Sequence, residues 1–185
     1  MILVYGGTFN PPTKAHYEIA KALIAKYKPQ GFYFLPVGDK YNKDGIINFK
    51  YRYEMLSLLC QKLPNTFVSN LENCNCFKGT YHSLKAFKKL DKDIYFVMGS
   101  DNLSYLNHWI KADKLVSEFK FICINRGSYD DLSFIKTNFS RYQDHFILFD
   151  YHSQISSSAF RKNKDASYLC RDIYEYVVTN KLYEV

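Results

Sequence analysis

The chain has 185 residues, which is enough for one domain with a substantial buried core. Hydrophobic residues make up 47% of the sequence and aromatic residues 18%, so an intrinsically disordered chain is excluded. Lys and Arg number 25 against 18 Asp and Glu, and the resulting net charge of +7 favours an anionic partner without choosing among nucleic acid, membranes and small polyphosphates.

Strands and helices are expected to alternate along the chain, as judged from the spacing of the apolar residues. The expected strands span residues 2–5, 31–37, 66–69, 94–98, 119–124 and 146–149. The expected helices span residues 14–28, 49–63, 81–90, 102–115 and 166–178, and another begins near residue 156. This alternation predicts an α/β fold, with a doubly wound parallel sheet in a single domain over residues 1–185. In such a sheet, ligands bind at the carboxyl ends of the strands, where the strand order reverses.

The first 16 residues carry the most informative motif. Gly6 and Gly7 follow the first strand and permit a sharp turn with close approach of the backbone to a ligand. Two prolines delay the next helix, which Thr13 can cap and which carries His16 in its first turn. Free backbone N–H groups and the helix dipole favour an anion there, so the motif predicts a phosphate site. For the two glycines alone, an ordinary turn explains the pattern equally well.

A second phosphate motif, Ile-Ser-Ser-Ser-Ala-Phe-Arg, spans residues 155–161. Ser156 and Ser157 at a helix start offer hydroxyls and backbone N–H groups, and the Arg161 guanidinium could add charge to grip a triphosphate. Taken alone, helix-capping serines and a solvent-exposed arginine would also explain this segment.

A third segment, Gly-Ser-Asp-Asn-Leu at residues 99–103, is followed by the single tryptophan of the chain. Asp101 could accept hydrogen bonds from ribose or base donors. Trp109 could stack on a pyridine ring, although a tryptophan is more often an anchor of the core.

Together these segments resemble a known family. Gly-Gly-Thr-Phe-Asn-Pro-Pro-Thr-x-x-His at residues 6–16 resembles the nucleotidyltransferase superfamily with the (His/Thr)-x-x-His motif, and more narrowly the nicotinate-nucleotide adenylyltransferases. Residues 155–161 resemble the Ile-Ser-Ser-(Thr/Ser)-x-x-Arg signature of that superfamily. Residues 99–103 with Trp109 resemble the Gly-(Ala/Ser)-Asp-Asn-Leu…Trp stretch of the adenylyltransferases. The resemblance covers the chain from its first residues to its last and implies a Rossmann-like nucleotidyltransferase fold.

The resemblance also implies roles for individual residues. The implied catalytic residues are Thr13, His16, Lys43 and Arg161, with Lys40 as the rival of Lys43. The implied ATP-binding residues are Gly6, Gly7, Thr8, Phe9, His16, Gly99, Asp101, Ile155, Ser156, Ser157 and Arg161. The implied mononucleotide-binding residues are Asn10, Lys43, Thr80, Tyr81, Asp101, Leu103, Trp109 and Arg126. Arg52, in an Arg-x-x-Met helix, is expected to support the loop that carries the lysines.

The activity that the resemblance implies is adenylyl transfer from ATP to nicotinate mononucleotide, which gives deamido-NAD and pyrophosphate in NAD biosynthesis. Mg²⁺ is expected to arrive with ATP. Two alternatives stay open. One is a sister enzyme acting on nicotinamide mononucleotide or on pantetheine phosphate, whose relatives carry a threonine where Thr13 stands. The other is a nucleotide-sensing domain without catalysis.

Other features indicate what the chain lacks. The five cysteines stand at unrelated spacings, and Cys74 and Cys76 are too close for a zinc knuckle, so we expect reduced thiols and no permanent metal site. No block of Lys and Arg is longer than a pair, which argues against a nucleic-acid partner. Without a signal peptide or a membrane-spanning apolar run, a cytoplasmic protein is expected. The sequence leaves open whether the chain forms a homo-oligomer.

Overall fold

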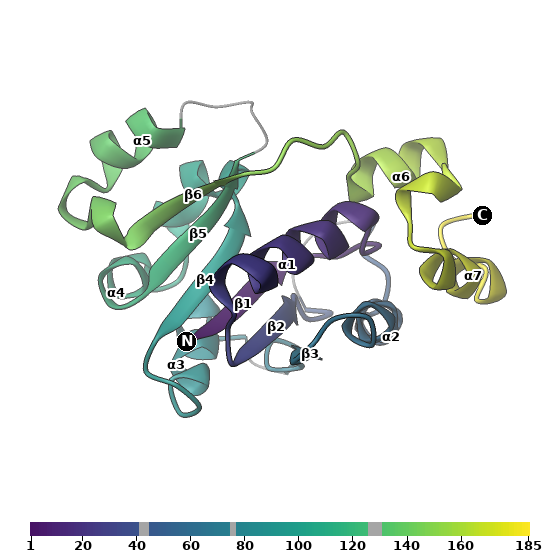
Figure 1. The fold of residues 1–185 in the computed structure, drawn as a ribbon, viewed down its shortest axis with the longest axis horizontal. Helices are drawn as coiled ribbons and strands as arrows, with labels where there is room; N and C mark the ends of the chain where they lie inside the picture. Colours follow the sequence, from purple (N-terminus) through teal and green to yellow (C-terminus); the bar gives the residue numbers. More distant parts are fainter. Residues whose placement is uncertain (41–44, 75–76, 126–130) are drawn as a thin grey trace.

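The computed structural model describes residues 1–40, 45–74, 77–125 and 131–185, shown as a coloured ribbon in Figure 1. The described residues form a sheet of six strands in the order β3-β2-β1-β4-β5-β6, and every neighbouring pair is parallel. The strands are β1 (Ile2–Gly7), β2 (Gly31–Pro36), β3 (Thr66–Val68), β4 (Ile94–Gly99), β5 (Lys120–Asn125) and β6 (Phe146–Asp150). The doubly wound parallel sheet is therefore confirmed, and the strand order reverses between β1 and β4.

Helices cover both faces of this sheet (Figure 1). The α-helices are α1 (Lys14–Tyr27), α2 (Phe49–Cys60), α3 (Thr80–Phe87), α4 (Ala112–Glu118), α5 (Asp131–Asn138), α6 (Ser157–Asn163) and α7 (Arg171–Thr179). The 3₁₀ helices are η1 (Ser100–His108), η2 (Ser140–His145) and η3 (Ala166–Tyr168). No helix that the described residues form combines the length and the apolar character needed to cross a bilayer.

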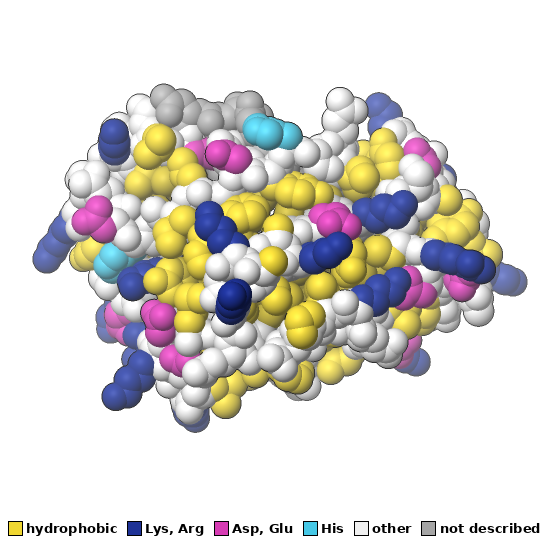
Figure 2. Space-filling view, in the orientation of Figure 1, with side chains coloured by type: hydrophobic (Ala, Val, Ile, Leu, Met, Phe, Trp, Pro, Cys, Tyr) yellow, Lys and Arg dark blue, Asp and Glu magenta, His cyan; other side chains and the backbone are white. Residues whose placement is uncertain are grey.

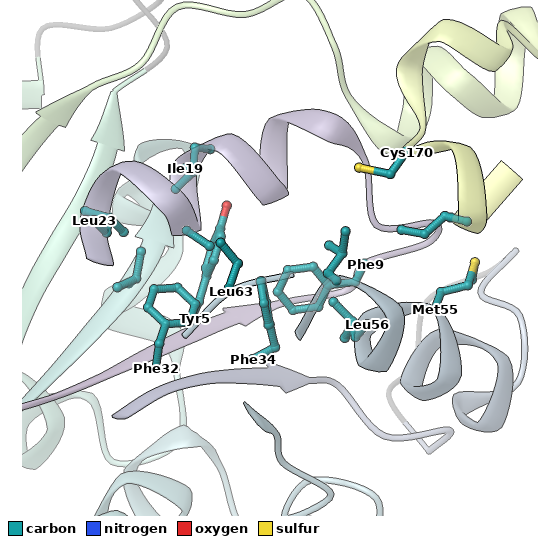
Figure 3. Close-up of a cluster of buried hydrophobic side chains, with 14 of the residues drawn as sticks. Tyr5, Phe9, Ile19, Leu23, Phe32, Phe34, Met55, Leu56, Leu63 and Cys170 are labelled. Atoms are coloured by element: carbon teal, nitrogen blue, oxygen red, sulfur yellow. The ribbon is translucent and has the colours of Figure 1, made fainter. Parts of the chain in front are cut away.

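Two clusters of buried side chains sit on the two faces of the sheet. Alternate residues of β1 join different clusters, Leu3 with the one under α1 and Val4 with the one over α3 and α4. This alternation explains why β1 reads as a continuous apolar run, because both of its faces are buried. Figure 3 shows the α1-side cluster, in which the rings of Tyr5, Phe9 and Phe34 pack together within 6 Å between centroids.

The predicted helix over residues 102–115 is divided in the structure. η1 ends at His108, Trp109 is extended, and Lys111 adopts a left-handed conformation with φ 60 before α4 begins. The break fits a tertiary contact, because Ile110 packs so closely on Gly79 that a Cβ at the glycine would lie 2.7 Å from the Ile110 Cβ. Local helical periodicity gives way here to packing between distant segments.

Two further differences concern the last third of the chain. The predicted helix over residues 166–178 is divided into η3 and α7, with Cys170 extended between them. The sequence did not predict α5 and η2. In α5 the buried residues are only Asp131 and Ile135, so the helix shows little apolar periodicity.

The sharp turn predicted at Gly6 and Gly7 is wrong, because β1 continues through both glycines and neither has a positive φ. The left-handed residue is Phe9, with φ 50. The glycines provide space instead: a Cβ at Gly6 would lie 2.3 Å from the Phe96 ring, and one at Gly7 would lie 3.0 Å from the Phe9 ring. Phe96 has little room to retreat, because it is 2% exposed and packs edge-on against Trp109.

We therefore expect Gly6→Ala to lower the free energy of unfolding by about 1–3 kcal/mol, the usual cost of overpacking a core. Urea unfolding measures this loss. Gly7→Ala is the matched control and should lose less, because its Cβ would meet a ring at 3.0 Å and not at 2.3 Å. A Gly6→Ala variant as stable as the parent protein would contradict the spatial role of this glycine.

Candidate functional site

A cavity of about 460 Å³ opens at the carboxyl ends of β1 and β4, where the strand order reverses. Residues far apart in the sequence line it, among them Gly7 at the end of β1 and Arg161 on α6. The predicted site residues in its wall are Gly6, Gly7, Thr8, Phe9, Asn10, His16, Thr80, Gly99, Asp101, Trp109, Ser156, Ser157 and Arg161. The two phosphate motifs of the sequence therefore face one shared space.

Four other predicted site residues do not line the cavity. Thr13 is fully buried, and Leu103 belongs to the cluster over α3 and α4. Tyr81 donates its hydroxyl to Glu118 at 2.7 Å, and Ile155 is half-buried without lining the cavity.

Three predicted basic residues are not among the described residues that line the cavity. Lys43 and Arg126 lie outside the described residues. Lys40 is exposed and does not line the cavity.

His16 lies in the first turn of α1 and is held through its Nδ1 atom. The Thr13 backbone N–H donates to Nδ1 at 2.9 Å, and the Thr13 hydroxyl oxygen lies 2.9 Å from the same atom. Because the N–H donor requires a lone pair on Nδ1, this network assigns the ring proton to Nε2. The imidazole also packs edge-on against Phe9, with 5.1 Å between ring centroids. Thr13 and Phe9 thus fix both the tautomer and the orientation of His16.

α6 is tied directly to the loop that follows β1. The Arg161 guanidinium donates to the Asn10 carbonyl at 2.5 Å, and the Ser157 hydroxyl donates to the Pro11 carbonyl at 2.8 Å. Ser156 caps α6, since its hydroxyl oxygen accepts a backbone N–H of the first turn at 3.0 Å. The serine run is therefore both a helix cap and a contact between segments about 150 residues apart.

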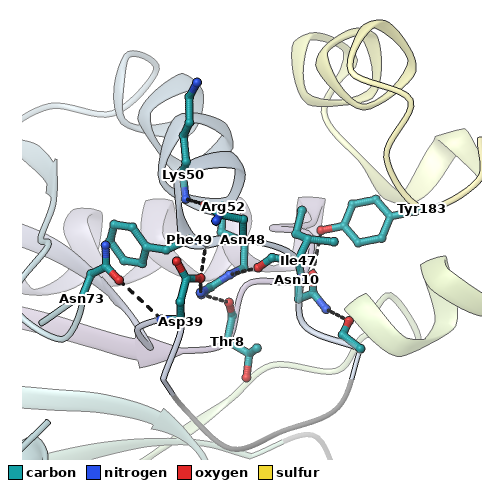
Figure 4. Close-up of polar contacts among 11 residues, drawn as sticks. Thr8, Asn10, Asp39, Ile47, Asn48, Phe49, Lys50, Arg52, Asn73 and Tyr183 are labelled. Atoms are coloured by element: carbon teal, nitrogen blue, oxygen red, sulfur yellow. Dashed lines mark hydrogen bonds and ion pairs between the residues drawn. The ribbon is translucent and has the colours of Figure 1, made fainter. Parts of the chain in front are cut away.

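The Asn10 side chain holds the loop that precedes α2. Its Nδ2 donates to the Gly45 carbonyl at 2.8 Å, and its Oδ1 accepts the Ile47 backbone N–H at 3.3 Å. Asn10 is 3% exposed, so this amide is engaged mainly with the chain itself (Figure 4).

Arg52 also holds the loop between β2 and α2, as expected from the sequence. Its Nε donates to the Ile47 carbonyl at 2.9 Å and one of its terminal nitrogens donates to the Thr8 carbonyl at 3.1 Å. The guanidinium lies 3.6 Å from a carboxylate oxygen of Asp39, which in turn accepts the Phe49 backbone N–H (Figure 4). Burial lowers the pKa of Arg52, and the Asp39 carboxylate opposes that change. One buried cation therefore joins the loops after β1 and β2 to the start of α2.

Aromatic and aliphatic side chains form part of the wall. Trp109 lines the cavity and packs edge-on against Phe96, with 6.1 Å between ring centroids. It therefore serves as a packing anchor and as cavity lining at once. Ile110 and Phe77 add apolar surface to the same wall. No sequence pattern indicated Phe77, whereas Ile110 directly follows Trp109, which the sequence analysis singled out.

Glu72 is the most informative residue that sequence reasoning missed, since it stands in a polar segment without a recognisable pattern. It lines the cavity, is 4% exposed, and accepts a hydrogen bond from the Ser83 hydroxyl at 3.1 Å and another from the Thr80 side chain. Burial raises the pKa of its carboxyl to about 7, and the two hydroxyls oppose part of that rise. Glu72 therefore connects the start of α3 to the cavity.

The raised pKa of Glu72 makes stability depend on pH. The folded protein holds this proton more tightly than the unfolded chain, whose carboxyl has its ordinary pKa of 4.5, so stability falls as the pH rises from about 4.5 to about 7. We expect Glu72→Gln to remove this fall and to be more stable than the parent protein at pH 8 by about 3 kcal/mol.

Urea unfolding at several pH values between 5 and 8 measures this difference. The matched control is Glu175→Gln, because Glu175 is exposed and forms its ion pair with Arg171 on the same helix. Parallel stability curves for Glu72→Gln and the parent protein across this range would show that the Glu72 proton is not linked to folding.

Comparisons with known proteins agree with this geometry. A family model described as cytidylyltransferase-like matches residues 4–163. A relative from Acholeplasma laidlawii (strain PG-8A), named "Probable nicotinate-nucleotide adenylyltransferase", is 37% identical over 190 residues, covering 100% of this chain and 98% of its own.

Two solved structures of Plasmodium falciparum nicotinic acid mononucleotide adenylyltransferase are also similar. The complex with NaAD has a TM-score of 0.83 and the complex with APC a TM-score of 0.81, each at 25% identity. Both comparisons cover 99% of this chain, together with 97% and 96% of the respective solved chains. The chain therefore belongs to the cytidylyltransferase-like family, among the nicotinate-nucleotide adenylyltransferases.

Proposed function

We propose that the chain transfers the adenylyl group of ATP to nicotinate mononucleotide, giving deamido-NAD and pyrophosphate. The observation that carries this proposal is that Gly7, His16 and Arg161 line the same cavity, although the first and last are 154 positions apart. The 37% identical relative and the solved complex with NaAD support the choice of reaction and acceptor.

The reaction needs no nucleophile from the protein, because the phosphate of the mononucleotide already carries negative charge. One of its oxygens attacks the α-phosphorus of ATP in line, a new P–O bond forms, and the bond from the α-phosphorus to the bridging oxygen breaks. Pyrophosphate leaves with that oxygen. The chain contributes positioning of the two nucleotides and stabilisation of the charge that develops on the leaving group.

His16 supplies one donor to that developing charge through Nε2–H, since its Nδ1 accepts from the Thr13 N–H. Thr13 is therefore proposed as a positioning residue and not as a phosphate ligand, because it is fully buried and its hydroxyl contacts the His16 ring. The Thr8 hydroxyl and the backbone N–H groups near Gly7 would hold further phosphate oxygens, since both residues line the cavity.

Arg161 would bind the β- and γ-phosphates. The contact of its guanidinium with the Asn10 carbonyl leaves other N–H donors of the fork for an anion. Ser158 lies 3.4 Å from this guanidinium and lines the same cavity. The lysine that is expected to close over the phosphates stays a prediction, since Lys43 lies outside the described residues.

The mononucleotide would occupy the part of the cavity lined by Thr80, Trp109 and Asp101. The Trp109 ring offers a flat apolar surface for a pyridine, and the Asp101 carboxylate offers an acceptor for ribose hydroxyls. Asp101 folds back over the end of β4, because a Cβ at Gly99 would lie 2.2 Å from its carboxylate oxygen.

Mg²⁺ is proposed to enter as part of the MgATP substrate. Within the described residues, no group of three or more His, Cys, Asp or Glu side chains is placed to hold a metal ion. The carboxylates that line the cavity are those of Glu72, which is hydrogen-bonded to the start of α3, and Asp101. A magnesium ion that keeps its waters and the ATP phosphates as ligands fits this donor set.

The activity is tested by pyrophosphate release from MgATP with nicotinate mononucleotide, nicotinamide mononucleotide or pantetheine phosphate as acceptor. Turnover with nicotinate mononucleotide at the highest kcat/KM is expected. A higher kcat/KM with either other acceptor would contradict the proposed substrate. ATP binding without turnover on any acceptor would indicate a nucleotide-sensing domain.

We expect His16→Ala to lower kcat a few hundred-fold while the chain stays folded, because removing one preorganised donor costs about 3–4 kcal/mol at the transition state. Steady-state kinetics with nicotinate mononucleotide measure the effect. His152→Ala is the control, since His152 is exposed and does not line the cavity, and it should keep its turnover. Near-normal turnover in His16→Ala would remove His16 from the mechanism.

A further inference from the structure

The segment after α7 folds back toward the cavity. Lys181, Tyr183 and Glu184 adopt left-handed conformations, with φ between 51 and 60. Leu182 is 8% exposed and its backbone N–H donates to the Val177 carbonyl at 3.0 Å, which turns the chain back over α7. Non-glycine residues in this conformation cost free energy, so their surroundings hold the segment in place.

This fold-back places Tyr183 next to Asn10, a residue that lines the cavity. Its ring packs edge-on against Phe160 of α6, with 5.9 Å between centroids, and its carbonyl accepts a hydrogen bond from the Lys164 ammonium group. Its hydroxyl donates to Asn10 Oδ1 at 2.8 Å (Figure 4). Phe160 precedes Arg161 in α6, so Tyr183 contacts the helix that carries the proposed phosphate-binding arginine and the loop that accepts from it.

The Tyr183 hydroxyl is the donor in its contact with Asn10, and its buried position favours the protonated phenol. Burial raises the pKa of Tyr183, although the nearby Arg161 and Arg52 guanidinium groups lower it in part. A protonated phenol therefore meets an acceptor, and Asn10 Oδ1 accepts from it and from the Ile47 N–H together.

We propose that Tyr183 is a positioning residue of the ATP site, which acts through Asn10 and so makes the segment after α7 part of the phosphate-binding machinery. Asn10 joins three chain segments: its side chain contacts Tyr183 and the loop over residues 45–47, and its carbonyl accepts from Arg161. Loss of the phenol hydroxyl would remove one of the three hydrogen bonds of the Asn10 side chain and leave those with Gly45 and Ile47. Asn10 would then be held less tightly on the side of α6, and its carbonyl, which orients the Arg161 guanidinium, would shift. This inference rests on the proposed function.

The test is Tyr183→Phe, which keeps the ring against Phe160 and removes only the hydroxyl. Its matched control is Tyr176→Phe on α7, which removes the hydrogen bond from the Tyr176 hydroxyl to Glu54 of α2 and leaves Asn10 untouched. Both variants lose one tyrosine hydrogen bond near the same end of the chain, so thermal melting should show comparable stability losses.

We expect kcat/KM for ATP to fall about tenfold in Tyr183→Phe, the equivalent of one lost hydrogen bond, and to change less than twofold in Tyr176→Phe. KM for nicotinate mononucleotide should change less than twofold in both variants. Equal values of kcat/KM for ATP in the two variants, whether both near normal or both reduced, would overturn the proposal.

A double-mutant cycle with Asn10→Ala tests the route of the effect. If Tyr183 acts through Asn10, adding Tyr183→Phe to Asn10→Ala should cause no further loss of kcat/KM for ATP. Fully additive losses would overturn that route. Absence of turnover in the parent protein would count against the proposed function itself, whereas an active parent with an unaffected Tyr183→Phe counts against Tyr183 alone.

Discussion

The hydrogen bond from the Arg161 guanidinium to the Asn10 carbonyl is the interaction on which the site depends. It joins the loop after β1 to α6, two segments that the sheet topology alone would leave separate. The Ser157 hydroxyl strengthens the same junction by donating to the Pro11 carbonyl. The contact uses one donor of the guanidinium and fixes this group beside the cavity that both segments line.

The sheet and the buried Arg52 guanidinium hold the loop after β1, which carries the Asn10 carbonyl that accepts from Arg161. The reversal of strand order between β1 and β4 opens the space, and Gly6 leaves room for the Phe96 ring that forms part of its wall. Arg52 is fully buried, so its charge would be costly without the Thr8 and Ile47 carbonyls that accept from it. The same two hydrogen bonds therefore hold the loops after β1 and β2 beside the cavity.

Predictions from the sequence were most accurate where the signal comes from neighbouring residues. Strands buried on both faces read as apolar runs, and Thr13 with His16 at residues 13–16 marks a helix start that the structure confirms. The predictions failed where a structural feature is caused by contact with a segment far away in the sequence. The spatial role of Gly6 has no local signal, because the Phe96 ring that it accommodates is 90 positions away in the sequence. Likewise, nothing near Glu72 or Tyr183 in the sequence indicates that folding brings each to the cavity or to Asn10.

The central claim is that one nucleotide lies between the end of β1 and Arg161, with its phosphates held by both. A crystal structure of the chain with a non-hydrolysable ATP analogue tests it most directly. The account predicts one triphosphate within hydrogen-bond distance of both His16 Nε2 and the Arg161 guanidinium, inside the cavity that both residues line. A triphosphate that contacts only one of these two groups, or that binds elsewhere on the chain, would contradict it.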